Sequence, residues 1–315
     1  FIIFIIIENK ISNPVIDFSL FKIRSFTLSS IVIGLIGVTS VISFNFINFF
    51  FKSISNYTTL ESGNILFFLA LGFIISSLIA GKLATKIKIS HIVFFSIIIC
   101  IISVVLLTSI SPNTTKMHFI IILFISGFGI GAPSAQLVAT ALADVPSEKN
   151  GLASGLNNII QKIFMLVLTA IMTFTLANNL DNAYNKTKND LITNVYSSQV
   201  LDQKTKNIVI GKLNTLTKTN SEKVQNDINL ELQKNNSLSA INNMSVEEKK
   251  QLVQKQNQIV KYLTTTIKGG QDEMLTNSSN SFTSTFKMSY VLLVIALLLC
   301  PFVNPNFKKR ISPND

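Results

Sequence analysis

The chain has 315 residues, of which 48% are hydrophobic and only 14% are charged. With a mean hydropathy of +0.46 the chain is too apolar for an ordinary soluble domain. The sequence therefore indicates a membrane protein that is embedded in the lipid bilayer. The net charge of +11 does not indicate nucleic-acid binding, because the lysines flank apolar segments or fill one long polar stretch.

The chain opens on the apolar residues 1–7, read FIIFIII. Seven residues at about 1.5 Å each are too few to cross about 30 Å of hydrocarbon, so we interpret them as the end of a preceding transmembrane helix. Residues 8–27 are polar, with Lys10, Lys22 and Arg24 among phenylalanines. Such a segment is either a cytoplasmic interfacial segment, with rings in the lipid and basic groups outward, or an ordinary connecting loop.

Apolar segments long enough to span a bilayer then follow, five of them within residues 28–177 and one near the C-terminus. We expect transmembrane helices at about 28–51, 62–83, 91–110, 118–142, 152–177 and 286–303. Residues 304–315 form a short basic tail. The predicted fold class is therefore all-α, a polytopic membrane protein.

Small residues mark the fourth and fifth of these segments. They are Gly127, Gly129 and Gly131 before the turn at 144–149, and Gly151 and Gly155 after it. Because membrane helices associate by close backbone approach at small residues, we expect both segments to pack tightly. Pro133 weakens the hydrogen-bond ladder of its helix; it is either a hinge for a rocking motion or the packed kink of a static helix.

Residues 178–284 differ in composition, being rich in Asn, Lys, Thr, Ser and Gln with spaced apolar positions. Ser245 and Glu248 have capping-box spacing, and Gly269-Gly270 would end the helix that follows. We predict three or four amphipathic helices here; the alternative is a partly disordered polar insertion.

Six neutral amides in or at the edge of the predicted spans are candidate functional residues. They are Asn45, Asn48, Gln136, Asn157, Asn158 and Gln161. Each either lines a substrate cavity or joins two helices by a hydrogen bond. No Asp, Glu or Arg falls in the middle of a span, and no catalytic or metal-ligand cluster is apparent, so we expect neither an enzyme nor a bound cofactor.

The orientation follows from charges in the short connections. Lys and Arg gather in alternate connections, at 10–24, 82–88, 149 and 308–310, which predicts that these lie in the cytoplasm. The C-terminus is then cytoplasmic, and the stretch 178–284 is extracytoplasmic.

Three motifs resemble one transporter family. The segment Asn13 to Thr27, NPVIDFSLFKIRSFT, is similar to the cytoplasmic segment before the ninth helix in the fourteen-helix drug:proton antiporter branch (the EmrB/QacA type) of the major facilitator superfamily. Gly151 to Asn158, GLASGLNN, after Asp144-Val145-Pro146, is similar to the branch's helix start. Gly81, Lys82, Leu83 and Lys86 resemble the superfamily's cytoplasmic loop motif, although Thr85 stands at its Asp position; simple anchoring by positive charge is the alternative.

The resemblance implies the C-terminal six-helix half of a multidrug exporter in the cell membrane. It implies alternating access, export of hydrophobic or cationic compounds, and a proton gradient as the energy source. The coupling groups and the missing N-terminal half of the transporter would then lie upstream of residue 1. The alternatives are an exporter of a metabolite, peptide or lipid, and a non-transporting membrane protein whose outer loop binds a partner.

Overall fold

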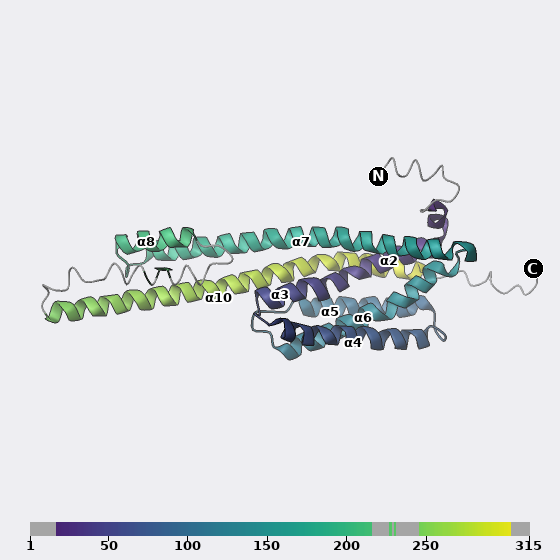
Figure 1. The fold of residues 1–315 in the computed structure, drawn as a ribbon, viewed down its shortest axis with the longest axis horizontal. Coiled ribbons are helices and arrows are strands. Elements are labelled where there is room, and N and C mark those ends of the chain that lie inside the picture. The colour runs from purple at the N-terminus through teal and green to yellow at the C-terminus, as the bar shows by residue number, and fades with distance from the viewer. Residues whose placement is uncertain (1–16, 216–226, 229, 231–245, 304–315) are drawn as a thin grey trace, which may run out of the picture. The chain divides into compact units, whose positions relative to one another are not determined.

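The computed structural model describes residues 17–215, 227–228, 230 and 246–303, and in these ranges it is all-helical (Figure 1). Six of the described helical segments are long and apolar enough to cross a membrane. The predicted fold class, an all-α polytopic membrane protein, is thereby confirmed. The predictions for residues 1–7, 8–16 and 304–315, and the capping residue Ser245, fall outside the described residues.

The first span is a nearly unbroken rod from Arg24 to Ser53. It consists of α2 (Arg24–Val41), a π-helical turn η2 (Ile42–Phe46) and α3 (Ile47–Ser53), and it follows the short 3₁₀ helix η1 (Phe18–Lys22). The π turn inserts an extra residue into the helix and so changes which side chains share a face above and below it.

The next three spans are α4 (Thr59–Leu83), α5 (Ile89–Leu107) and α6 (Lys116–Ala143). Local chemistry defines two of their beginnings: Thr58 and Glu61 form a complete capping box at α4, and the Thr115 side chain accepts from the His118 backbone N–H at α6. After the 3₁₀ turn η3 (Ser147–Lys149), α7 runs from Asn150 to Ser197. The remaining helices are α8 (Gln203–Asn214), α10 (Val246–Leu299) and η5 (Cys300–Phe302).

The chain divides into two compact units. Unit 1 comprises residues 1–176 and 282–315, and unit 2 comprises residues 177–281. Within unit 1, α6 is the central element, because α2, α4 and α5 all pack against it (Figure 1). Buried residues of α2, α5, α6 and the end of α10 form its main apolar core, which includes Val32, Ile97, Leu137 and Leu293.

Glycines bring α4 and α6 into backbone contact. A Cβ added at Gly127 or at Gly131 would collide with backbone carbonyl oxygens of α4, those of Leu69 and Phe73 respectively. Gly129, on another side of α6, leaves room for Cys100 of α5, whose Sγ would lie 2.8 Å from an added Cβ. The three glycines therefore set the spacing of three helices, which is the packing role that the sequence suggested for them.

Gly151 and Gly155 differ from that expectation. Both are exposed, and a Cβ at either position would meet no atom within 4 Å in the described residues. The close approach of α7 is made instead by glycines of α2: an added Cβ at Gly34 would lie 2.9 Å from the Phe164 ring, and one at Gly37 would lie 3.2 Å from Met165 Cγ. The small residues at this contact lie on α2, so α7 can carry bulky side chains there.

Unit 2 has an apolar core of its own. Leu191 and Val195 of α7, Val209 and Leu213 of α8, and Leu263 and Ile267 of α10 are its main buried members. Polar contacts join the same helices: Lys188 Nζ donates to the Asn214 carbonyl at 3.0 Å, and Tyr262 Oη donates to the Asn194 carbonyl at 2.9 Å. The described part of the polar stretch is thus folded as packed amphipathic helices.

Two of the long helices extend far beyond the predicted spans. α7 continues past residue 177 to Ser197, and α10 begins at Val246 rather than near 286. The prediction that Gly269-Gly270 ends a helix is wrong, because α10 runs through both and no described glycine has the positive φ of a helix-terminating cap. Gly270 is needed instead for packing, since a Cβ there would lie 2.5 Å from the Leu191 side chain.

Candidate functional site

A hollow in unit 1 lies among α2, α6 and α7. It has a volume of about 560 Å³, within the usual range for small-molecule sites. Its lining residues are Ile33, Ile36, Gly37, Ser40, Ile130, Ser134, Ala135, Val138, Ala139, Gln161 and Met165. None of them is ionisable, so the wall is apolar with a few neutral polar groups.

The lining residues follow helical spacing on each helix. On α2 the hollow takes positions 33, 36, 37 and 40, and on α7 it takes positions 161 and 165. Residues three, four and seven apart share one face of an α-helix, so each helix presents a single face to the hollow. Gly37 and Ala135 leave space in the hollow, because neither has a long side chain that could fill it.

Gln161 is the one predicted cavity residue that the structure places in the lining. Its Nε2 is buried and has no hydrogen-bond partner among the described residues. Ser134, another polar residue of the lining, donates its hydroxyl to the Ile130 carbonyl of its own helix at 2.6 Å. Gln161 therefore differs from Ser134 in having unused donors.

Asn157 lies one turn before Gln161 but joins two helices. Ser30 Oγ of α2 donates to Asn157 Oδ1 at 2.8 Å, and Asn157 is only 1% exposed. Ser43 of η2 and Ser126 of α6 form a similar buried hydroxyl pair. These contacts match the second of the two roles considered for amides in the spans, the joining of neighbouring helices.

The other predicted cavity residues lie outside the hollow. Asn45 is exposed in the π turn, Asn48 is half-buried in α3, and Asn158 is exposed on α7. Gln136 is buried in α6, but it is not part of the lining. Conversely, Ser40 and Ser134 line the hollow although they were not among the cavity candidates; the sequence shows them only as members of the small residues that recur along α2 and α6.

Pro133 is buried in the interior of α6, between Ala132 and Ser134. Because proline has no N–H, it cannot donate to the carbonyl four residues earlier, that of Gly129. The hollow residues Ile130 and Ser134 lie beside this interruption. Both roles considered for Pro133, a hinge and a static kink, fit this position.

An ion pair links the segment before α2 to the turn before α7. Lys149 Nζ lies 2.6 Å from Asp17 Oδ2, and Asp17 also accepts from the Ser19 backbone N–H at 2.8 Å, which caps η1. The bond from Lys149, and then that from Ser19, lowers the pKa of Asp17 to about 2. Arg24 lies over the Phe302 ring at 5.4 Å, so α2 and η5 meet at this end as well.

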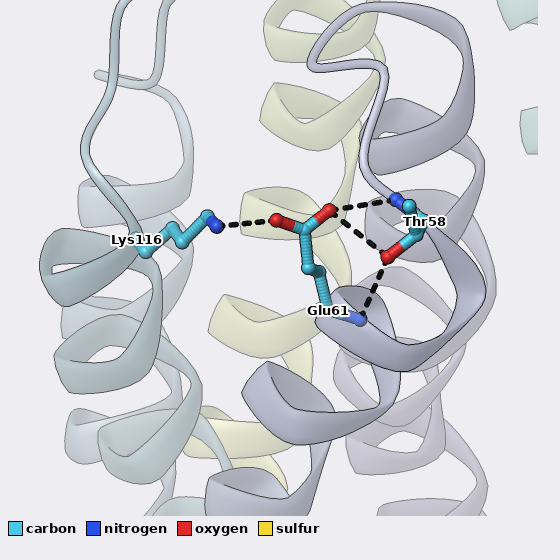
Figure 2. Close-up of polar contacts among 3 residues, drawn as sticks. All are labelled: Thr58, Glu61 and Lys116. Carbon is cyan, nitrogen blue, oxygen red and sulfur yellow. Dashed lines mark hydrogen bonds and ion pairs between the residues drawn. The ribbon is translucent and has the colours of Figure 1, made fainter.

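A second ion pair lies at the beginning of α4 and α6 (Figure 2). Lys116 Nζ contacts Glu61 Oε1 at 2.5 Å, while Glu61 Oε2 accepts from the backbone N–H of Thr58 at 2.9 Å. Lys116 also lies 5.2 Å from the centre of the Tyr57 ring. Because both charged side chains are more than a third exposed, the pair orients the two helix ends rather than adding much stability.

The loop that follows α4 carries the residues that resemble a cytoplasmic motif. Gly81, Lys82, Leu83 and Lys86 are all exposed, and Thr85 Oγ1 donates to the Lys82 carbonyl at 2.8 Å. Within the described residues neither lysine forms an ion pair. The carboxylate that the motif would use is absent, and the threonine caps the helix end in its place.

Comparison with known proteins supplies the family. The model of the Major Facilitator Superfamily matches residues 7–169, more than half of the chain. The chain belongs to the major facilitator superfamily. All residues that line the hollow fall within the matched range.

Relatives in this superfamily carry transporter names. Multidrug resistance protein 3 of Bacillus subtilis (strain 168) is 29% identical over 192 residues, covering 60% of this chain and 38% of the relative. Quinolone resistance protein NorB of Staphylococcus aureus (strain JH9) is 25% identical over 200 residues, covering 58% and 40%. Riboflavin transporter RibZ of Clostridioides difficile (strain 630) is 27% identical over 181 residues, covering 57% and 40%.

The chain thus belongs to a family of membrane transporters and not of enzymes, and its six described candidate spans are those of a multi-pass membrane protein, as the sequence predicted. The alignments span well under half the length of each of these relatives. The described residues contain no group of three or more His, Cys, Asp or Glu that could hold a metal ion.

Proposed function

We propose that this chain forms one half of a multidrug-efflux transporter of the fourteen-helix drug:proton antiporter branch, and that the hollow among α2, α6 and α7 is its wall of the substrate path. The observation that carries the proposal is the uncharged lining of a hollow of about 560 Å³. An apolar wall with neutral polar groups suits hydrophobic compounds and delocalised cations, since it imposes no fixed charge on them.

One observation supports the choice of substrate, and a second supports the role of the hollow. The relatives include proteins named for multidrug and quinolone resistance. The family-matched range also contains every residue that lines the hollow. The sequence motifs near Asp17 and at Gly151–Asn158 occur in the order found in the fourteen-helix branch, which is why we assign the chain to its C-terminal half.

The energy source that we propose is a proton gradient, without any cofactor. The hollow has no carboxylate or other group that could carry a proton. The coupling groups would then belong to the other half of the transporter, which the relatives' greater length accommodates. Alternating access would move the two halves against each other around the substrate.

For the orientation, we propose that the connections near Asp17, Lys82 and Lys149 lie in the cytoplasm of the cell. These connections hold most of the lysines of the short loops, as the positive-inside rule predicts, whereas the opposite short connections hold only Lys52 and Lys116. The Asp17–Lys149 ion pair and the Arg24–Phe302 contact join segments that the rule places on this side. Unit 2 would then be extracytoplasmic.

The test is proton-driven uptake of tetraphenylphosphonium into everted membrane vesicles, in which an exporter moves its substrate inwards, with the protein at the length that its own cell makes. Filling the hollow with Ser134→Trp should lower the rate about tenfold or more, because bound probe would lose at least about 1.4 kcal/mol. Ile121→Trp, on an exposed face of the same helix, is the control. Equal uptake in both variants, or none in the parent protein, would refute the proposal.

A second candidate is a metabolite exporter. The relative named riboflavin transporter covers a similar share of the chain at similar identity. In that case vesicles would accumulate riboflavin and not tetraphenylphosphonium, and Ser134→Trp would again lower the rate.

A further inference from the structure

We infer that Gln161 gives the hollow a preference for substrates that present a hydrogen-bond acceptor oxygen, such as a carbonyl. This inference deepens the proposed function and rests on it for the role of the hollow. Its basis is the buried and unpartnered amide nitrogen of Gln161, which lies on a residue of the lining.

A buried amide nitrogen without a partner is a costly group. Most buried polar atoms in native proteins are paired, because removal from water is compensated only by a new hydrogen bond. The glutamine amide offers two N–H donors, and unlike a serine hydroxyl it cannot easily turn to a backbone carbonyl of its own helix. Among the described residues this nitrogen has no acceptor and almost no accessible surface, so a turn of the Gln161 side chain towards the hollow would bring it to an acceptor on a ligand or water there.

Other unpartnered atoms do not compete for this role. The described residues contain buried, unpaired polar atoms on Ser25, Ser29, Thr39, Ser55, Ser62, Asn150, Asn157 and Gln161, and of these residues Gln161 is the one that lines the hollow. Asn157 already bonds Ser30 through its oxygen. Ser134 uses its proton on the Ile130 carbonyl. The unused amide donors of the wall are therefore those of Gln161.

The surroundings make this donor selective. Met165 lies one helical turn further along α7, and the lining contributed by α2 and α6 is apolar apart from Ser40 and Ser134. A hydrogen bond made in such an environment discriminates against a substrate that lacks the acceptor, because the donor is then left unpaired. A cation with a carbonyl on its apolar arm should bind better than the same cation with a hydrocarbon arm.

The experiment compares two matched probes by equilibrium binding to the purified protein, at its native length, in lipid nanodiscs. One probe is a triphenylphosphonium cation with a methyl ketone on its alkyl arm, and its twin has CH–CH₃ in place of the carbonyl. After subtraction of binding to empty nanodiscs, the parent protein should favour the ketone about fivefold, the value of one ordinary hydrogen bond. Gln161→Met should remove this preference.

Ile163→Met is the matched control, because it introduces the same side chain on α7 at an exposed position outside the lining. It should keep the fivefold preference. An equal ratio in the parent and in Gln161→Met, or no binding of either probe, would overturn the inference. Selective binding without any efflux would refute the proposed transport while leaving this inference intact, and efflux with unaltered selectivity in Gln161→Met would do the reverse.

Discussion

The carboxylate of Asp17 joins η1 to the turn before α7. It caps η1 through the Ser19 N–H and pairs with Lys149 of the turn before α7. Both contacts favour the ionised carboxylate, so the pKa of Asp17 is lowered from 3.8 to about 2. A lowered folded-state pKa stabilises the folded protein above the unfolded pKa, and this stability is lost as the pH falls through the folded pKa.

Ionisation of Asp17 should make the stability of the folded protein depend on pH between about 4 and about 2. Because Lys149 is about half exposed, we expect the ion pair to contribute about 1 kcal/mol or less at neutral pH. Asp17→Asn should lower the thermal midpoint at pH 7 slightly and should remove the part of the acid-induced fall that lies in this range. Thermal unfolding in detergent measures it, with Asp202→Asn as a comparison because the pKa of Asp202, in the other unit, is also lowered. An identical acid profile for parent and Asp17→Asn would contradict the assignment.

Residue chemistry predicted the site only in part. The sequence identified Gln161 as a cavity candidate because an amide in an apolar span needs a reason to be there. It could not decide between Gln161 and Asn157, since only the structure shows which amide meets Ser30 and which lines the hollow. The same limit explains Gly151 and Gly155: a small residue on one helix is useful only where a partner helix approaches, and the approach occurs at glycines of α2.

At the scale of elements, the contact of α4 with α6 rests on backbone proximity. Gly72 of α4 and Gly127 of α6 each lie so close to the other helix that an added Cβ would collide with a carbonyl oxygen, that of Phe124 or of Leu69. Backbone cannot move aside as a flexible side chain can, so the two helices must separate if either glycine is replaced.

The element-scale prediction compares two alanine substitutions. Gly127→Ala should destabilise the protein by about 1–3 kcal/mol through overpacking. Gly63→Ala is the control, because Gly63 lies in α4 with nothing within 4 Å of an added Cβ, and it should stabilise by up to about 1 kcal/mol through helix propensity. Denaturant unfolding followed by circular dichroism reports both. Equal effects of the two substitutions would show that the α4–α6 spacing is not fixed by glycine.

The helices themselves were largely predictable, but not all of their ends were. Each predicted span overlaps a helix of the structure, because about twenty apolar residues in a row have few other stable conformations in lipid. For α7 and α10 the change from apolar to polar composition near residues 177 and 285 marks no helix end. Asn-, Lys- and Thr-rich sequence continues the helix, stabilised by the apolar core that includes Leu191 and Leu263.

At the scale of the molecule, the two units have separate cores. The core of unit 2 is built from residues between 191 and 267, and the hollow of unit 1 uses residues between 33 and 165. The buried residues of the unit 2 core therefore contribute nothing to the lining of the hollow.

The corresponding prediction is that residues 181–280, replaced by a short Gly/Ser linker in the protein at its native length, are dispensable for insertion. The shortened protein should keep at least partial efflux of tetraphenylphosphonium in the vesicle assay, because the lining of the hollow is left intact. The parent protein provides the reference rate, and the amount of each protein in the membrane fraction reports insertion. Complete loss of efflux in a protein that still inserts would favour the alternative in which the helices of unit 2 bind a partner.

If substrate occupies the hollow among α2, α6 and α7, it should protect a cysteine in the wall of the hollow from chemical labelling. Ser134→Cys would be labelled with a small maleimide in native membranes, and Ser147→Cys, on the exposed turn before α7, would serve as the control. Cys100 and Cys300 are buried, and the parent protein gives their background. We predict that saturating tetraphenylphosphonium slows labelling at position 134 several-fold and leaves position 147 unchanged. Equal rates at position 134 with and without the cation would contradict the account.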